Sequence, residues 1–146
     1  MFDDATLKDV FHRHGMRYTR QRAAVYAALA STKSHPTAEE LLTAVRGDEP
    51  GISLGTVYNT LETLIEMGLC QRLAPPSPAH AARYDADTSD HVHVAAADGS
   101  VIDLPTDLSE RVLGQMPADL TEELADRLGA PIERLSVQVV LGDRNR

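Results

Sequence analysis

The first half of this chain combines four segments of helical periodicity with two short strand-like segments that follow directly. The helical segments begin near Leu7 and at the capping residues Thr19, Thr37 and Ser53. The third also carries a capping box, because Glu40 stands three residues after Thr37. Helices followed by a β-hairpin, here LCQRLA and ARYD, give the order of a winged helix. The sequence therefore predicts an α+β protein whose N-terminal domain is a winged helix.

The fourth helical segment, SLGTVYNTLETLIEMG at 53–68, has an apolar face and a polar face. Its buried stripe is expected to hold Val57, Leu61, Leu64 and Ile65. Its outward residues near the start are expected to be Thr56, Tyr58, Asn59 and Thr60. The first residues of the second helix of a helix-turn-helix meet base edges in the major groove, so Thr56, Tyr58 and Asn59 are candidate DNA contacts. An ordinary amphipathic helix with a solvated polar face remains the alternative.

Charge is distributed unevenly along the chain, whose formal net charge is -8. Residues 1–75 hold eight Lys/Arg and nine Asp/Glu, whereas residues 76–146 hold six and thirteen. A basic cluster near the start contains Arg17, Arg20 and Arg22, which are candidate contacts to DNA phosphates. The acidic second half should repel DNA, so the pattern indicates two modules. A solvated helix face is the alternative interpretation of the cluster.

The second half predicts a small α/β domain with the order strand, strand, helix, helix, strand. The strands are expected in HVHVAA, SVIDL and LSVQVVL, and the helices at 106–116 and 119–128. Asp119 and Glu122 are expected to form a capping pair. One face of such a sheet is apolar, and its own helices or a second subunit must cover it. We expect the domains to span 1–84 and 85–146.

The stretch SDHVHVAAADGSVIDL indicates a metal site. His91 and His93 lie two residues apart, so on a strand they share one face. A three-residue loop over 97–99, with Gly99 left-handed, pairs His93 with Asp103 and brings the three polar side chains to the same face. A two-residue turn would mix polar and apolar side chains on both faces, so we expect the three-residue loop.

Two histidines and one carboxylate suit iron(II), manganese(II) or zinc(II) better than copper(I) or a thiolate cluster. Surface histidines at this spacing are common, so a solvated pair remains the alternative. The single cysteine, Cys70, excludes an internal disulfide and a cysteine-rich zinc site within one chain, and we expect it to be buried. The sequence shows no leader and no apolar run long enough for a bilayer, so we expect a cytoplasmic protein without a membrane partner.

Several motifs resemble, in order, the ferric uptake regulator superfamily and most closely its peroxide-sensing branch. They are GMRYTRQR at 15–22, HPTAEEL at 35–41, SLGTVYNTLETLIEMGL at 53–69, RYD at 83–85 and DHVH at 90–93. The resemblance covers almost the whole chain. It implies a homodimeric, metal-dependent repressor, with a dimerisation and regulatory domain after the winged helix. Its partner would be a double-stranded DNA operator, which we expect to be palindromic.

The resemblance also implies a regulatory metal held by three histidines and two carboxylates. The matching positions hold His35, Asp85, His91, His93 and Asp103. Peroxide-sensing members tend to carry Asp at the last of these positions. Asp103 therefore favours the peroxide-sensing branch. The nitrogen and oxygen ligands suit Fe(2+) or Mn(2+), with Zn(2+) also compatible, and the resemblance makes His35 and His91 the expected oxidation-sensitive residues.

The chain departs from most members of that family because it lacks the two Cys-x-x-Cys pairs of a structural zinc site. The first pair would fall at Ala95 to Asp98, and the second near the C-terminal GDRNR. We therefore expect no structural zinc held by four cysteines and a dimer held by packing alone.

Four functions are open from the sequence. The leading hypothesis is a repressor, not an enzyme, that senses peroxide by metal-catalysed oxidation of a histidine ligand. The second is a repressor that reports only the level of iron, manganese or zinc. The third is a metal-dependent enzyme that uses the same His/Asp residues, although it would leave the winged helix unexplained. The fourth is a winged helix that binds proteins rather than DNA.

Overall fold

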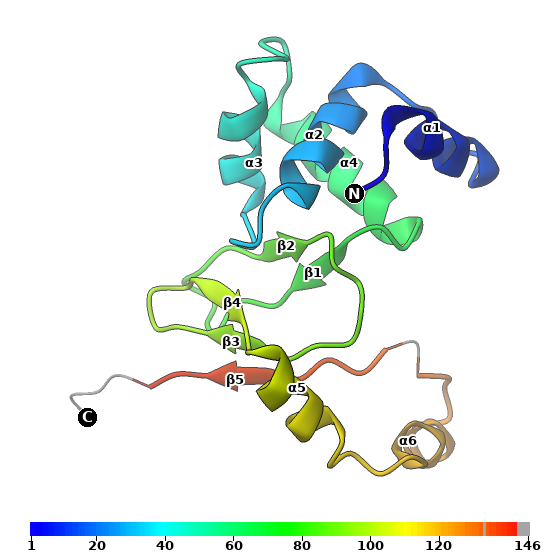
Figure 1. Cartoon of the computed structure of the whole chain (residues 1–146), viewed down its shortest axis with the longest axis vertical. Helices are drawn as coiled ribbons and strands as arrows, with labels where there is room; N and C mark the ends of the chain where they lie inside the picture. The colour runs from blue at the N-terminus through cyan, green and yellow to red at the C-terminus, as the bar shows by residue number, and fades with distance from the viewer. Residues whose placement is uncertain (133, 143–146) are drawn as a thin grey trace. The chain divides into compact units, whose positions relative to one another are not determined.

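The computed structural model describes residues 1–132 and 134–142. The chain divides into two compact units, Met1–Thr88 and Ser89–Arg146 (Figure 1). Residues 143–146, which form most of the segment where the second cysteine pair of the family would fall, lie outside the described residues. Within the described ranges, no helix has both the length and the apolar character needed to cross a membrane.

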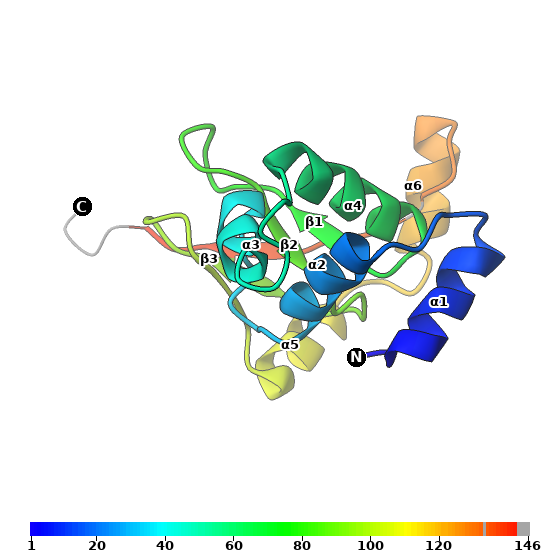
Figure 2. The same ribbon diagram turned by 90° about the horizontal axis from the view of Figure 1, so that it is seen from above.

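The first unit has the winged-helix order that the sequence predicts. Its elements are α1 (Asp4–Arg13), α2 (Arg20–Ala30), α3 (Ala38–Val45), α4 (Leu54–Glu66), β1 (Gln71–Leu73) and β2 (Arg83–Asp85). Strands β1 and β2 pair antiparallel, and α2, α3 and α4 lie together over this hairpin (Figure 2). The predicted caps are confirmed, because Thr19, Thr37 and Ser53 each accept a hydrogen bond from a backbone amide of the first turn.

Apolar side chains from all four helices form the core of this unit. Seven of them are less than 2% exposed: Phe11, Val25, Leu29, Leu41, Val57, Leu61 and Leu64. Full burial of one such aliphatic or aromatic side chain stabilises a fold by about 1.5–3 kcal/mol. The core therefore fixes the relative positions of α2, α3 and α4, and with them the surface that α4 presents.

One expectation about α4 is wrong. Thr60 is fully buried rather than outward, and its hydroxyl donates a hydrogen bond to the carbonyl of Thr56 at 2.7 Å. The helical period explains the burial, because Thr60 lies three residues after Val57 and beside Leu61 on the same buried stripe. The bond to the preceding turn satisfies the hydroxyl group.

The second unit contains a three-stranded sheet and two helices. Its elements are β3 (His93–Ala95), β4 (Val101–Asp103), α5 (Thr106–Leu113), α6 (Leu120–Leu128) and β5 (Gln138–Val140). The strand order is β4-β3-β5, in which β3 pairs antiparallel with β4 and parallel with β5. Helix α5 ends at Leu113, before the expected residue 116, because Gly114 caps it. The predicted capping pair at Asp119 is wrong, since its φ of -96° and ψ of 3° are not extended and its side chain makes no cap hydrogen bond.

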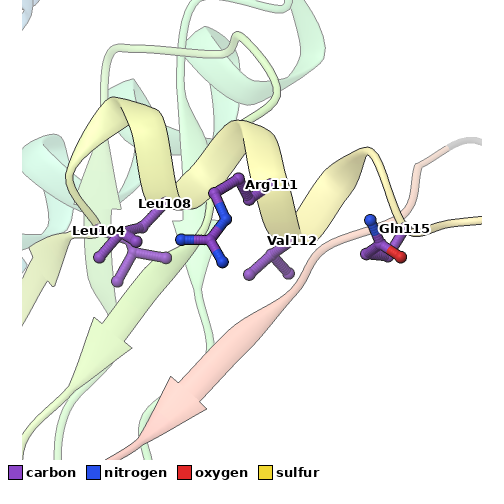
Figure 3. Close-up of a pocket in the computed structure, with 5 residues that line it drawn as sticks. All are labelled: Leu104, Leu108, Arg111, Val112 and Gln115. Carbon is purple, nitrogen blue, oxygen red and sulfur yellow. The ribbon is translucent and has the colours of Figure 1, made fainter.

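The second unit leaves much apolar surface exposed. Among the described residues, α6 buries no side chain and α5 buries only Ser109. The side chains of Leu104, Leu108 and Val112 line a groove of about 410 Å³ along α5 (Figure 3). Ile102 and Val139, which pair with Val94 and share its face of the sheet, are 58% and 39% exposed. Helices α5 and α6 therefore leave part of the apolar face of the sheet uncovered, and a large apolar surface of this kind is typical of an interface.

Cys70 is buried in the first unit, as the sequence predicts, with 4% of its surface exposed. Burial raises the pKa of its thiol to about 12. The reactive form of cysteine is the thiolate, so this side chain has almost none of the nucleophilic form at neutral pH. Its position is that of an apolar core residue.

The raised pKa predicts that Cys70 lowers stability at alkaline pH. The unfolded thiol loses its proton near its ordinary pKa of 9.0, whereas the folded thiol keeps it up to about 12. The unfolded state thus binds fewer protons in this window, and the free energy of unfolding should fall by about 1.4 kcal/mol per pH unit for this group. Denaturant unfolding from pH 8 to 11 should show a shallower decline for Cys70→Ala than for the wild type. Parallel declines in the two proteins would contradict this assignment.

Candidate metal centre

The β3–β4 hairpin has the register that the sequence predicts. His93 pairs with Asp103 and Val94 pairs with Ile102. Gly99 has a φ of 85°, a left-handed conformation that glycine adopts without the steric cost of a side chain. Its amide donates to the carbonyl of Ala96 at 3.0 Å, which closes the turn. The three-residue loop with a left-handed glycine is therefore confirmed, and it places His93 opposite Asp103.

Three polar side chains converge on this hairpin. One carboxylate oxygen of Asp103, Oδ1, lies 3.1 Å from Nε2 of His91 and 3.6 Å from Nε2 of His93. The two imidazole rings are 4.3 Å apart between centroids. His93 is almost fully buried, while the Asp103 side chain is 36% exposed. The residue types and their convergence suit a first-row divalent metal ion, which takes imidazole nitrogens and carboxylate oxygens.

The hydrogen bond at the far side of His91 orients its ring for ligation. Nδ1 lies 2.8 Å from the carbonyl oxygen of Ser89. A carbonyl oxygen can only accept, so Nδ1 must carry the proton in this bond. In the neutral ring this leaves the lone pair on Nε2, the atom that faces Asp103. Metal-binding histidines usually show this arrangement, in which the distant ring nitrogen donates to a fixed acceptor.

The first unit brings together the other two candidate ligands. Nε2 of His35 lies 3.2 Å from Oδ2 of Asp85, and both side chains are more than nine-tenths buried. Two links tie β2 to the segment before α3: the amide of Tyr84 donates to the carbonyl of Pro36 at 3.0 Å, and Arg83 donates to that of His35 at 3.0 Å. These bonds place the end of β2, where Asp85 lies, against His35.

The backbone of His35 is strained. Its φ of 52° makes it the sole residue other than glycine with a positive φ among the described residues. Such a conformation costs on the order of 1–3 kcal/mol and persists where the surrounding contacts impose it. Left-handed residues of this kind cluster at functional sites, so the strain supports a role for His35 beyond starting a helix.

The five predicted ligands thus form two groups, each within one unit. His35 and Asp85 make a pair in the first unit, and His91, His93 and Asp103 make a triad in the second. The sequence could predict the triad from strand alternation and turn type. It gave no local reason to pair His35 with Asp85, which are 50 residues apart, and only the family resemblance suggested that pair.

The candidate DNA contacts lie on the first unit, and several of them have protein partners. Arg20 pairs with Glu49 at 3.3 Å, and Arg22 donates to the carbonyl of Arg17 at 2.6 Å. Arg17 and Arg20 are exposed. Tyr58 is 40% exposed, and its hydroxyl donates to Glu39 at 3.3 Å.

The two remaining candidates differ in their surroundings. Thr56 shares a hydrogen bond with Ser53 at the start of α4, whereas Asn59 is exposed. The sequence did not reveal Glu39 or Glu49 as partners of Tyr58 and Arg20, because each lies on a different segment from its partner.

Known proteins resemble this chain in both sequence and structure. The peroxide operon regulator of Bacillus subtilis (strain 168) is 36% identical over 99 residues, which are 67% of this chain and 64% of that protein. This chain thus spans less than two thirds of that relative's length.

Two solved structures match over nearly the whole chain. The Campylobacter jejuni peroxide stress regulator has a TM-score of 0.63 at 26% identity, with 98% of this chain and 97% of that chain covered. A zinc-bound manganese uptake regulator has a TM-score of 0.61 at 26% identity, with 94% and 99% covered.

The family match extends over both units. Residues 13–126 match the Ferric uptake regulator family. This range runs from the end of α1 through both units and into α6. Because the match covers most of the chain and includes all five candidate ligands, the chain belongs to the Ferric uptake regulator family.

Proposed function

We propose that this protein is a metal-dependent repressor that binds operator DNA through its first unit and senses peroxide through its metal ligands. The convergence of His91, His93 and Asp103 on one hairpin carries the proposal. A solvated histidine pair would need neither the burial of His93 nor the contact of His91 Nδ1 with the carbonyl of Ser89. The winged-helix order of the first unit and the family membership supply the DNA-binding part of the proposal.

The proposed centre joins the His35–Asp85 pair to the hairpin triad around one ion. Fe(2+) or Mn(2+) suits the three nitrogen and two oxygen donors, and Zn(2+) is compatible with them. The ion would link residues from both units and thereby restrict the motion between them. It would also add positive charge to the second half of the chain, which holds thirteen Asp/Glu against six Lys/Arg. Both effects favour the approach of DNA phosphates.

The proposed DNA surface uses Arg17, Arg20 and Arg22 for phosphates. Thr56, Tyr58 and Asn59 on α4 would read base edges in the major groove. Two such subunits would bind a palindromic operator, with recognition helices about one DNA turn, or roughly 34 Å, apart. A repressor acts in the compartment that holds the DNA, which agrees with the cytoplasmic location expected from the sequence.

We infer that the second unit forms the homodimer. Strand β5 lies at the edge of the sheet, and Val140 and the next residue, Leu141, are 58% and 49% exposed. An apolar edge strand of this kind is a ready template for pairing with a second copy. The one cysteine of each chain cannot form the four-thiolate zinc site of most relatives, so apolar packing must hold the subunits.

Peroxide is the signal that two of the reported similarities favour. The Bacillus subtilis relative and the Campylobacter jejuni structure are both named as peroxide regulators. Bound iron(II) would be the centre at which peroxide is cleaved beside the ligands, and the two electrons for the net reduction of peroxide would come from the imidazole ring. One oxygen atom of peroxide would enter an imidazole ring of His35 or His91, and the other would leave as water. The oxidised ring is less basic and binds metal less well, so the operator would be released.

A repressor that reports only the metal level is the second candidate. The structural match to a manganese uptake regulator supports it, because the overall fold does not distinguish the two signals. The His/Asp residues give no reason to propose an enzyme, and the family consists of regulators. The response of the histidines to peroxide separates the two candidates.

DNA binding should depend on the metal. A duplex selected from a random pool with the manganese-loaded protein should bind about 5- to 150-fold more weakly after chelation, which is the usual range of coupling between two sites. Asp103→Asn should resemble the chelated protein at every metal concentration. Arg20→Ala should weaken binding to all duplexes and lower the slope of log affinity against log salt concentration by about one. Arg127→Ala on α6 is the matched control and should leave both unchanged. Equal affinity of chelated and metal-loaded wild type would refute metal gating.

Peroxide should oxidise a ligand histidine only in the iron form. Brief peroxide treatment of the iron(II) protein should add the mass of one oxygen atom to the peptide containing His35 or His91. The manganese(II) form should resist, because manganese(II) reduces peroxide poorly. Cys70→Ser should respond like the wild type, since the Cys70 thiol is buried with a pKa of about 12. A response abolished in Cys70→Ser, or unmodified histidines in peptide mass spectrometry, would favour the metal-level repressor.

The dimer should form without zinc and depend on apolar packing. Sedimentation of the chelator-treated protein should give a dimer, and metal analysis should find no tightly held zinc. Val140→Asp places a charge in the proposed interface and should weaken dimerisation by about tenfold or more, because an unpaired buried charge costs several kcal/mol. Ala44→Asp, on the exposed surface of α3, is the control and should remain dimeric. One chelator-resistant zinc per chain, or an unaffected Val140→Asp dimer, would contradict this arrangement.

A further inference from the structure

Ser109 connects helix α5 to the segment that carries His91 and His93. It is 4% exposed and, among the described residues, is the one that α5 buries. Its Oγ accepts a hydrogen bond from the backbone amide of Val92 at 2.8 Å. Val92 stands between His91 and His93 and is itself fully buried. The hydroxyl of Ser109 therefore holds the backbone at the midpoint between two candidate ligands.

The carbonyl group of Val92 is also held in place, by the residue that follows β4. The carbonyl of Val92 accepts a hydrogen bond from the amide of Leu104 at 2.8 Å. Leu104 directly follows Asp103, so this bond ties the histidine segment to the carboxylate ligand. The strand β3 itself begins only at His93, and His91 lies beyond its paired residues. Ser109 thus supports the part of the hairpin that the regular strand pairing does not reach.

We propose that Ser109 is a positioning residue of the metal centre and that loss of its hydroxyl weakens metal binding. This inference rests on the proposed function, in which His91, His93 and Asp103 bind the ion. Without the hydroxyl, the buried amide of Val92 has no acceptor from α5 and must turn to find another. A turn of this peptide moves the ring of His91 away from its 3.1 Å contact with Asp103. The ion then has to reorder the hairpin when it binds.

Helix α5 has few buried apolar contacts, so the hydrogen bond of the Ser109 hydroxyl contributes more to its placement than it would in a well-packed helix. Leu108 and Val112, which lie on either side of Ser109 along α5, are 38% and 37% exposed. They line the groove along α5 instead of a closed core (Figure 3). Within the described residues, the side chain that α5 buries thus makes a polar bond to Val92, between His91 and His93. Its removal should affect the ligands more than the core of the second unit.

Manganese(II) affinity of the full chain tests this proposal. Competition with a chromophoric chelator should show roughly tenfold weaker binding by Ser109→Ala, at the low end for residues that orient metal ligands. Ser109→Thr keeps the hydroxyl and should bind nearly as tightly as the wild type. Ser109→Val matches threonine in shape but lacks the hydroxyl, so it should resemble Ser109→Ala. This Thr/Val pair decides the question if Ser109→Ala does not fold.

A matched control separates metal positioning from general stability. Ser100→Ala removes a hydroxyl that donates to Asp98 at 2.6 Å in the turn of the same hairpin, away from the ligand segment. It should keep wild-type manganese affinity. The rise in Tm on adding manganese should shrink in Ser109→Ala and Ser109→Val but not in Ser109→Thr or Ser100→Ala, since ligand-linked stabilisation follows affinity.

The outcomes distinguish this inference from the proposed function. If the wild type binds manganese and the Thr and Val variants bind it equally well, Ser109 has no positioning role and the inference is overturned. If the substitutions lower Tm by the same amount with and without manganese and leave the affinity unchanged, Ser109 acts only on the fold. This result also overturns the inference. If the wild type binds no manganese or iron, the proposed metal centre fails, and the inference fails with it.

Discussion

The pairing of His93 with Asp103 across the β3–β4 hairpin is the constraint on which the candidate centre depends. His91, two residues before His93, turns its Nε2 toward the same carboxylate at 3.1 Å. A shift of one residue would exchange the polar and apolar faces and separate the ligands. Gly99 maintains this register, because its φ of 85° allows the turn that the three-residue loop needs. The chemistry of the site thus begins with the backbone conformation of a turn that contains no ligand.

The two units support their ligands in different ways. In the second unit, hydrogen bonds to Ser89 and Ser109 fix the ring of one histidine and the backbone beside it. In the first unit, the packing of four helices and the links from β2 impose a strained backbone on His35. The strain at His35 costs stability, and the large apolar core of the first unit can offset that cost. The second unit has few buried apolar side chains, so it depends more on polar bonds and on an apolar face open to a partner.

Most of the fold could be predicted because its local signals agree with one another. Caps at Thr19, Thr37 and Ser53 and the buried periodicity of α2 and α4 place the helices within a few residues. The two predictions that are wrong concern polar residues whose type fits more than one structural position. Thr60 is polar but lies on the buried stripe, and its own helix satisfies its hydroxyl. Asp119 is a common capping residue, but its backbone is not extended and its side chain makes no cap hydrogen bond to the first turn.

The sequence by itself determined the winged-helix order, the hairpin register and the triad of His91, His93 and Asp103. Each of these follows from contacts between residues near one another in the chain, so spacing and turn chemistry suffice to predict them. The tertiary structure alone decided the contact geometry of His35 with Asp85, the strain at His35 and the hydrogen bond from Val92 to Ser109. These contacts join segments that are 50 and 17 residues apart. Their geometry depends on how the core packs, which no local pattern of residues specifies.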